Sequence, residues 1–382
     1  MKEIDKLFLK YAENVAFVQL KEDKSIKIQD TFIDSSIPLP IVTEIFIEDL
    51  KKDEILEDIP LERIIQGMAY IIGADPEFKY NDKYIDFLSS IRDIAMRYIF
   101  KEAISYFDKK SYKLSALYFR TLTTVFPDND NFFYYALAIE AIGKELIEQD
   151  KIEEGNKFIV ESKNILENII DKSTDYYPAY YKLGYYYKYF NEFIKAKITW
   201  EKALRLDNDE NRKNEIRLEL EYMERDYTIE LAIWQINNLN YEKAIDELSK
   251  LVAKGKDDYY VNYLLGIAYS GYGNLELSKQ YLLIALDKND KDSNVYNELG
   301  IVYFNQGNIK EAVNIFTEGL KRFKDDYRLY FNRGLGYLNL GETMKGYFDI
   351  KKANELNNDD ENIRNQLKEI EKFITDMGEV IK

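Results

Sequence analysis

Acidic clusters are the features of this sequence that could do chemistry most directly, because carboxylate and amide oxygens are the ligands that calcium prefers. The clusters are DNDEN at 207–211, DKNDKD at 287–292 and NNDDEN at 357–362. A calcium loop of the EF-hand type needs glycine at its sixth position and glutamate at its twelfth. A loop that starts at Asp207 has Arg212 and Leu218 there, and a loop that starts in the second cluster fails in the same way. We therefore interpret the clusters as turns and helix caps, and we expect no metal site.

Most other catalytic constellations are excluded by residue type. The sequence has no cysteine and no histidine, so thiol nucleophiles, imidazole bases and the metal sites built from them cannot form. It contains neither the phosphate-binding pattern G-x-x-x-x-G-K-[ST] nor the nucleophile pattern G-x-S-x-G. Asp and Glu total 69, but nothing singles out a pair with two different environments. We expect a protein that is not an enzyme and needs no cofactor.

Charge and hydropathy restrict the classes of partner that the protein can bind and the cellular location that it can have. The formal net charge is -16, which argues against nucleic acid and against an anionic membrane surface as partners. The N-terminal segment is charged throughout, and no run of about 18 apolar residues occurs, so a signal peptide and a membrane span are not expected. These features predict a cytoplasmic protein that binds neither nucleic acid nor a membrane.

A period of 34 residues organises most of the chain. The segment YNELGIVYFNQGNIKEAVNIFTEGL, which starts at Tyr296, matches the segments 34 residues before and after it. Gly266, Gly300 and Gly334, for example, occupy equivalent positions. Four units in strict register start near Arg225, Tyr259, Ser293 and Tyr327.

Each unit has the pattern of two helices joined by a short turn, because apolar residues recur at spacings of three and four on both sides of it. Gly273, Gly307 and Gly341 are expected at the end of the first helix, where a left-handed backbone suits glycine. Gly300 and Ala312 are predicted to meet where the two helices cross, while large aromatic residues fill the space beyond.

The units resemble the tetratricopeptide repeat, with its L-G-x-x-Y pattern in the first helix and small, large and small residues in the second. A unit near 177 shows the pattern well: Leu183, Gly184, Tyr187, Ala196, Trp200 and Ala203. The resemblance covers 96–360, with units near 96, 130, 177, 225, 259, 293 and 327. It implies an all-α, right-handed α-solenoid of about seven helix pairs. A stripe of apolar residues in 361–382 predicts a C-terminal capping helix.

Two segments break the period. Near 140–170 both helices of a unit are expected to be longer than usual. In 210–238 about 14 extra residues carry an apolar stripe at helical spacing, which predicts a single long helix. Each elongation is either packed harmlessly on its neighbour or forms an edge for dimerisation.

The N-terminal segments are less regular. Residues 60–95 have the pattern of a degenerate helix pair. In 1–59 the stretches AFVQL and SIKIQ flank KEDK and predict a β-hairpin. We interpret 1–59 as a small cap, with a separate binding or lid element as the alternative.

In proteins with tetratricopeptide repeats, the first helices of the units line a concave groove that holds peptides or partner helices. This resemblance implies that positions two, five, nine and twelve of each unit face the groove. Its candidate binding residues are Tyr181, Tyr185, Tyr260, Tyr263, Asn294, Asn297, Ile301, Phe304, Asn305, Arg328, Phe331 and Leu335.

Family members that hold acidic chaperone tails use a clamp of Lys, Asn and Arg at groove positions. Here the matching positions carry Tyr263, Ile267, Glu298, Arg328 and Asn332, so the leading Lys and Asn are missing. Glu298 would also repel a carboxylate. We predict no binding of acidic tails.

The resulting hypothesis is a non-enzymatic scaffold or adaptor that binds a protein or peptide in its groove. Two alternatives remain open: a structural protein that forms homo-oligomers through the long helices, and a ligand-gated sensor whose N-terminal segment acts as a lid.

Overall fold

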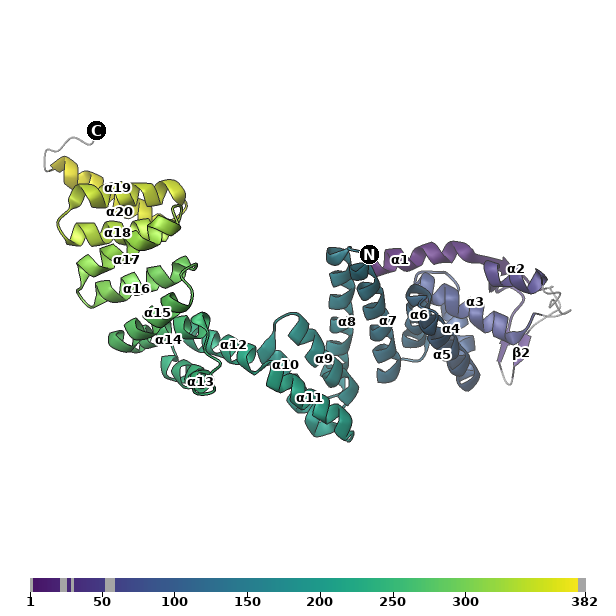
Figure 1. The fold of residues 1–382 in the computed structure, drawn as a ribbon. Helices are drawn as coiled ribbons and strands as arrows, with labels where there is room; N and C mark the ends of the chain where they lie inside the picture. Colours follow the sequence, from purple (N-terminus) through teal and green to yellow (C-terminus); the bar gives the residue numbers. More distant parts are fainter. Residues whose placement is uncertain (1–2, 21–25, 29–30, 52–58, 377–382) are drawn as a thin grey trace. The chain divides into compact units, whose positions relative to one another are not determined.

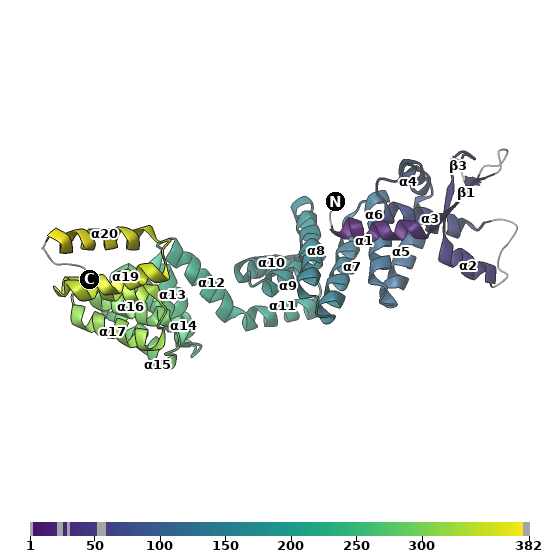
Figure 2. The same cartoon turned by 90° about the horizontal axis from the view of Figure 1, so that it is seen from above.

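The computed structural model describes residues 3–20, 26–28, 31–51 and 59–376. Contacts divide the chain into two units, Met1–Arg217 and Leu218–Lys382. Both units consist mainly of antiparallel helix pairs (Figures 1 and 2). The expected fold class, a right-handed α-solenoid of about seven helix pairs with a small N-terminal cap, is confirmed.

The first unit begins with a small α/β segment. Its elements are α1 (Glu3–Leu9), a 3-10 turn (Lys10–Asn14), β1 (Val15–Val18), β2 (Ile26–Ile28), β3 (Thr31–Ile33), β4 (Leu39–Val42) and α2 (Thr43–Lys51). Strand β1 pairs with β4, and β2 pairs with β3, both antiparallel. The expected hairpin between AFVQL and SIKIQ is therefore wrong in its pairing, because each stretch finds a different partner. Its turn, residues 21–24, lies outside the described residues.

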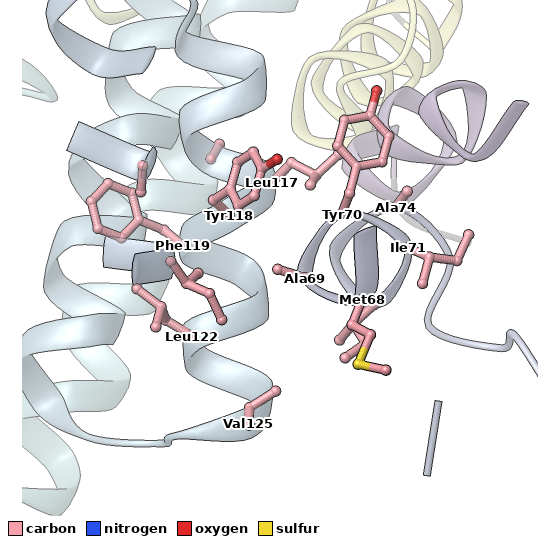
Figure 3. Close-up of a cluster of buried hydrophobic side chains, with 14 of the residues drawn as sticks. Met68, Ala69, Tyr70, Ile71, Ala74, Leu117, Tyr118, Phe119, Leu122 and Val125 are labelled. Carbon is pink, nitrogen blue, oxygen red and sulfur yellow. The ribbon is translucent and has the colours of Figure 1, made fainter. Parts of the chain in front are cut away.

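Helix α3 (Leu61–Ala74) joins this segment to the helices that follow. Two glycines allow the close approach on either side. A Cβ on Gly67 would lie 1.7 Å from the carbonyl oxygen of Pro40 in β4, and one on Gly73 would lie 2.3 Å from that of Leu117. Figure 3 shows the apolar side chains of α3 and α6 (Tyr112–Val125) that meet in this core. The described N-terminal residues thus share one core with the first helix pairs.

The helices of the first unit follow in order (Figure 1). They are α4 (Asn81–Ser90), α5 (Arg92–Asp108), α6, α7 (Asn129–Glu148), α8 (Ile152–Lys172), α9 (Tyr177–Tyr189), α10 (Phe193–Leu206) and the start of α11 (Glu210–Tyr222). The predicted elongation near 140–170 is confirmed, because α7 has 20 residues and α8 has 21. Their backbones nearly touch at Gly143 and Gly155, where an added Cβ on either would lie under 3 Å from the other's carbonyl oxygen.

The lengthened pair shares a cavity with α1, which is also joined to α6. Lys6 and Leu7 of α1 line the same cavity, of about 720 Å³, as Ile152 and Phe158 of α8. Arg120 of α6 forms an ion pair with Asp5 of α1.

Helix α11 occupies the second interruption. It begins 33 residues after the start of α9, where another first helix is due, but the next helix starts a new pair. The prediction of a single helix over 210–238 is wrong: α11 ends at Tyr222, and α12 (Glu224–Asn237) begins after Met223. Ion pairs from Lys254 and Lys256 to Glu224 hold the start of α12 to the far end of its partner helix.

The second unit continues with regular pairs, which Figure 1 shows stacked in sequence order. After α12 come α13 (Tyr241–Ala253), α14 (Tyr259–Tyr272), α15 (Leu275–Lys288), α16 (Ser293–Asn305), α17 (Ile309–Arg322), α18 (Tyr327–Asn339), α19 (Thr343–Leu356) and α20 (Glu361–Asp376). Ile363, Ile370 and Ile374 of α20 are buried in one cluster with α19, as a capping helix requires.

In four regular pairs, the glycine of the first helix at the L-G position or its equivalent receives a large side chain of the second helix: Gly184, Gly266, Gly300 and Gly334 face Trp200, Leu282, Phe316 and Ile350. A Cβ on Gly300 would lie 2.2 Å from Cε1 of Phe316, and the three atoms nearest to it all belong to that ring. The expected meeting of Gly300 with Ala312 stays a prediction, but the equivalent residues of the neighbouring pairs do meet: Ser278 Oγ donates to the carbonyl oxygen of Gly266 at 2.7 Å, and a Cβ on Gly334 would lie 3.1 Å from that of Gly346. The missing side chain of the glycine leaves a hollow on the first helix, and a large side chain of the second helix fills that space.

The turns follow the prediction. Gly273, Gly307 and Gly341 end their first helices with φ of 92°, 78° and 79°, which confirms the left-handed backbone expected there. Other pairs use larger residues at this point, and Leu239 adopts φ 59° with 71% of its side chain exposed.

Candidate partner-binding site

Polar side chains on α16 and α18 form a connected row on the first helices of the second unit. The Nδ2 of Asn332 donates to Oδ1 of Asn297 at 2.7 Å, and the Nδ2 of Asn297 donates to Oε1 of Glu298 at 3.2 Å. Two consecutive first helices are thereby joined side by side through amide groups. We call Tyr263, Asn294, Asn297, Glu298, Arg328 and Asn332 the polar row.

Arg328 forms the second connection in this row. Its guanidinium donates to Oδ1 of Asn294 at 2.7 Å and pairs with both carboxylate oxygens of Asp326. Burial raises the pKa of Asp326, but hydrogen bonds from Arg328 and Ser293 outweigh this effect and hold the pKa below its ordinary value. Since Asp326 also caps the start of α18 by accepting from the backbone N–H of Arg328, the arginine is held in a fixed orientation.

An aromatic pair borders the row on α14. The rings of Tyr260 and Tyr263 stack with their centroids 5.9 Å apart and an interplanar angle of 25°. Burial raises the pKa of the Tyr263 phenol well above its ordinary value, and the charge of Glu298 adds to the effect. The phenol of Tyr263 therefore lies within electrostatic range of the Glu298 carboxylate.

Glu298 is a half-buried carboxylate with few partners. Burial raises the pKa of its carboxyl group, although the hydrogen bond from Asn297 and the charge of Arg328 oppose this shift. Among the residues that the structure describes, it accepts a hydrogen bond from Asn297 and forms no ion pair.

The other candidate residues of the second unit surround the polar row in different ways. Ile301 and Phe304 are half-buried against the core between α16 and α17. Phe331 and Leu335 pack against the cluster formed with α19 and α20, so their burial already has a structural role. Asn305 is exposed at the end of α16.

Tyr181 and Tyr185 belong to the first unit and have an intramolecular partner. Their hydroxyl groups both donate to the carboxylate of Glu215 in α11, with a distance of 2.9 Å for Tyr181. Helix α11 thus lies against the face of α9 that was predicted to bind a partner. These two residues and the polar row belong to different units.

Sequence reasoning left Glu298 and Asn332 out of the candidate set. Both occupy position six of their units, next to position five, which was included. Their signal is a polar residue at the same place in two successive units, beside Asn297 at position five. Asn332 reaches Asn297 across the two helices because consecutive first helices lie side by side.

The architecture defines a class of protein: a helical repeat protein that stacks two-helix units. The family model described as "Tetratricopeptide repeat" matches residues 177–210 and 293–326. These segments coincide with the pairs that begin with α9 and α16, so these two helix pairs are tetratricopeptide repeats. No curated protein matches the chain.

Several solved structures resemble parts of this chain. YrrB, a tetratricopeptide protein described with an unusual peptide-binding site, is 19% identical, with 53% of this chain and 97% of YrrB covered and a TM-score of 0.37. A tetratricopeptide repeat protein from Parabacteroides merdae is 17% identical, with 71% and 97% covered and a TM-score of 0.37. The Thermus thermophilus protein TTC0263 is 19% identical, with 51% and 98% covered and a TM-score of 0.35. At these values the likeness concerns the fold alone.

No described helix combines the length and the apolar character that a membrane crossing requires.

Proposed function

We propose that the protein is a non-enzymatic scaffold that binds a peptide or a partner protein on the first helices α14, α16 and α18. The observation that carries this proposal is the polar row, where the buried Asn297 orients the half-buried amide of Asn332 on the adjacent helix, beside the stacked rings of Tyr260 and Tyr263. Amides offer both donors and acceptors, which suits an extended peptide backbone. Aromatic residues add contact area with little loss of conformational entropy.

The preorganised geometry favours binding further. Arg328 is fixed by Asp326 and Asn294, and Asn332 is fixed by Asn297. Side chains that are already ordered lose less entropy when a partner binds, so the affinity per contact is higher.

An array of several hundred random heptapeptides, probed with the full chain, tests this function. We expect Asn332→Ala to reduce binding to the selected peptides by about tenfold, since one amide contact and the orientation of Asn297 are lost together. Asn314→Ala is the matched control, because Asn314 is exposed on the second helix α17. Equal binding by both variants would contradict the proposed surface.

Self-association through α11 is a second candidate function. Leu218 and Tyr222 of this helix are 52% and 75% exposed, and exposed apolar side chains of this size are frequent at interfaces. Leu218 stands 34 residues after Gly184, at the position where other first helices open the hollow for a second helix. Light scattering of the full chain and of Leu218→Glu tests this function. A wild-type dimer that the substitution converts to a monomer supports self-association.

A further inference from the structure

The carboxylate of Glu298 has unused capacity for hydrogen bonds. A carboxylate offers about four acceptor positions. The described residues fill one of them, through the Nδ2 of Asn297 at 3.2 Å. A half-buried charge with so few partners is costly for a folded protein, so its position on the polar row needs a reason.

Arg328, the neighbouring cation, does not explain why a half-buried carboxylate lies at this position. Arg328 acts on the Glu298 carboxylate through space, but its guanidinium donates to Asp326 and Asn294. Arg333, the other arginine of α18, pairs with Asp349. Helices α14 and α16 carry no lysine or arginine at all.

The surroundings of Glu298 suit a cation from outside. The Tyr263 ring lies within electrostatic range of the carboxylate and stacks on Tyr260. Aromatic faces attract the cations of arginine and lysine side chains, and a half-buried carboxylate can form a charge-assisted hydrogen bond with either. The net charge of -16 would also increase the rate at which a basic peptide arrives.

We propose that Glu298 binds the side-chain cation of an arginine or lysine residue in the partner peptide. This inference rests on the proposed function, and it names the chemistry of the peptide: one basic residue enters beside Tyr263, while the amide of Asn332 holds the adjoining backbone. The negative charge of Glu298 is retained because it selects this residue.

Single substitutions in a bound peptide test the inference. Heptapeptides that the full chain selects from the array are resynthesised with each arginine replaced by citrulline, which keeps the shape and removes the charge. We expect one such replacement to weaken binding to the wild-type chain by about tenfold or more. Against Glu298→Gln the arginine and citrulline peptides should bind equally, as in a double-mutant cycle.

Controls separate the possible failures. Glu318→Gln removes the same charge from the exposed side of the second helix α17 and should keep the full preference for arginine. Peptides that bind through Asn332 but without any preference for a basic residue would overturn the role of Glu298 and leave the proposed function standing. The role is also overturned if Glu298→Gln keeps the preference. If no peptide binds to the wild-type chain, both proposals fail.

Discussion

Arg333 and Asp349 form a bidentate ion pair between α18 and α19. The Nε and Nη2 of Arg333 donate to the two carboxylate oxygens of Asp349 at 2.7 and 2.8 Å, and the aspartate is 8% exposed. Arg333 also lies over the rings of Tyr330 and Tyr337. This pair joins the two helices of the last repeat at a point where other repeats have apolar contacts.

Removing one partner of this pair should be more damaging than removing both. Arg333→Met leaves the buried charge of Asp349 uncompensated and should lower the free energy of unfolding by about 3 kcal/mol. The double variant Arg333→Met/Asp349→Leu should recover most of the loss. Urea denaturation measures both, and hydrogen exchange of α18 and α19 shows whether the loss is local. A double variant as unstable as the single one would contradict this explanation.

The hollow at Gly300 predicts a substitution that is severe and can be rescued. Gly300→Ala places a methyl group against the ring of Phe316, so we expect a loss of about 2 kcal/mol in the free energy of unfolding. Adding Phe316→Leu should restore part of that loss, because leucine fills the equivalent position in the Gly266 pair. Thermal unfolding of the single and double variants measures the rescue. The explanation requires the double variant to be the more stable of the two.

Leu239 offers a stabilising change. A leucine at φ 59° is strained, and Leu239→Gly should relieve it and raise the free energy of unfolding by about 1 kcal/mol. Asn238→Gly is the control, because Asn238 has φ −95° and gains nothing from glycine. Chemical denaturation of both variants tests the prediction, which fails if the two changes have the same sign.

Glu298→Gln should stabilise the folded chain near neutral pH. The folded pKa of Glu298 is raised above its ordinary value, chiefly by burial, so the folded state binds more protons than the unfolded state between the two pKa values. The stability that this group gains from protonation is complete below the unfolded pKa and is lost as the pH rises through the folded pKa. Urea midpoints of wild type and Glu298→Gln should therefore differ at pH 7 and converge below about pH 4. Constant midpoint differences across this range would contradict the assigned cause.

Acidic tails should not bind. A peptide ending in EEVD meets Glu298 and finds Arg328 already paired with Asp326. Fluorescence polarisation with a labelled peptide of this ending should show no binding at micromolar concentrations. Saturable micromolar binding would show that the polar row accepts a terminal carboxylate.

Local patterns predicted most of the repeat architecture. The left-handed turns at Gly273 and Gly307 follow from residue type and spacing alone, and the elongation of α7 and α8 follows from the disturbed period. Sequence reasoning failed where distant segments choose partners. Strand β1 pairs with β4, which also lies against α3 at Gly67, and nothing within β1 itself indicates this partner.

The candidate site stays a prediction. The family resemblance selected positions two and five, which include Asn294, Asn297 and Arg328. The sequence could not show that Tyr185 would donate a hydrogen bond to Glu215, because α11 looked like the beginning of one long helix. The sequence did contain a sign that Arg328 already has a partner, because the helix-capping Asp326 lies two residues earlier in the chain.

The close crossing of α7 and α8 at Gly143 and Gly155 links two segments that look unrelated in the sequence. The glycines bring the two backbones together near the turn, and Ile152 and Phe158 on either side of Gly155 line a cavity of about 720 Å³ with Lys6 and Leu7 of α1. A shortened α7–α8 pair would therefore remove one wall of this cavity and open its other wall, on α1, to solvent.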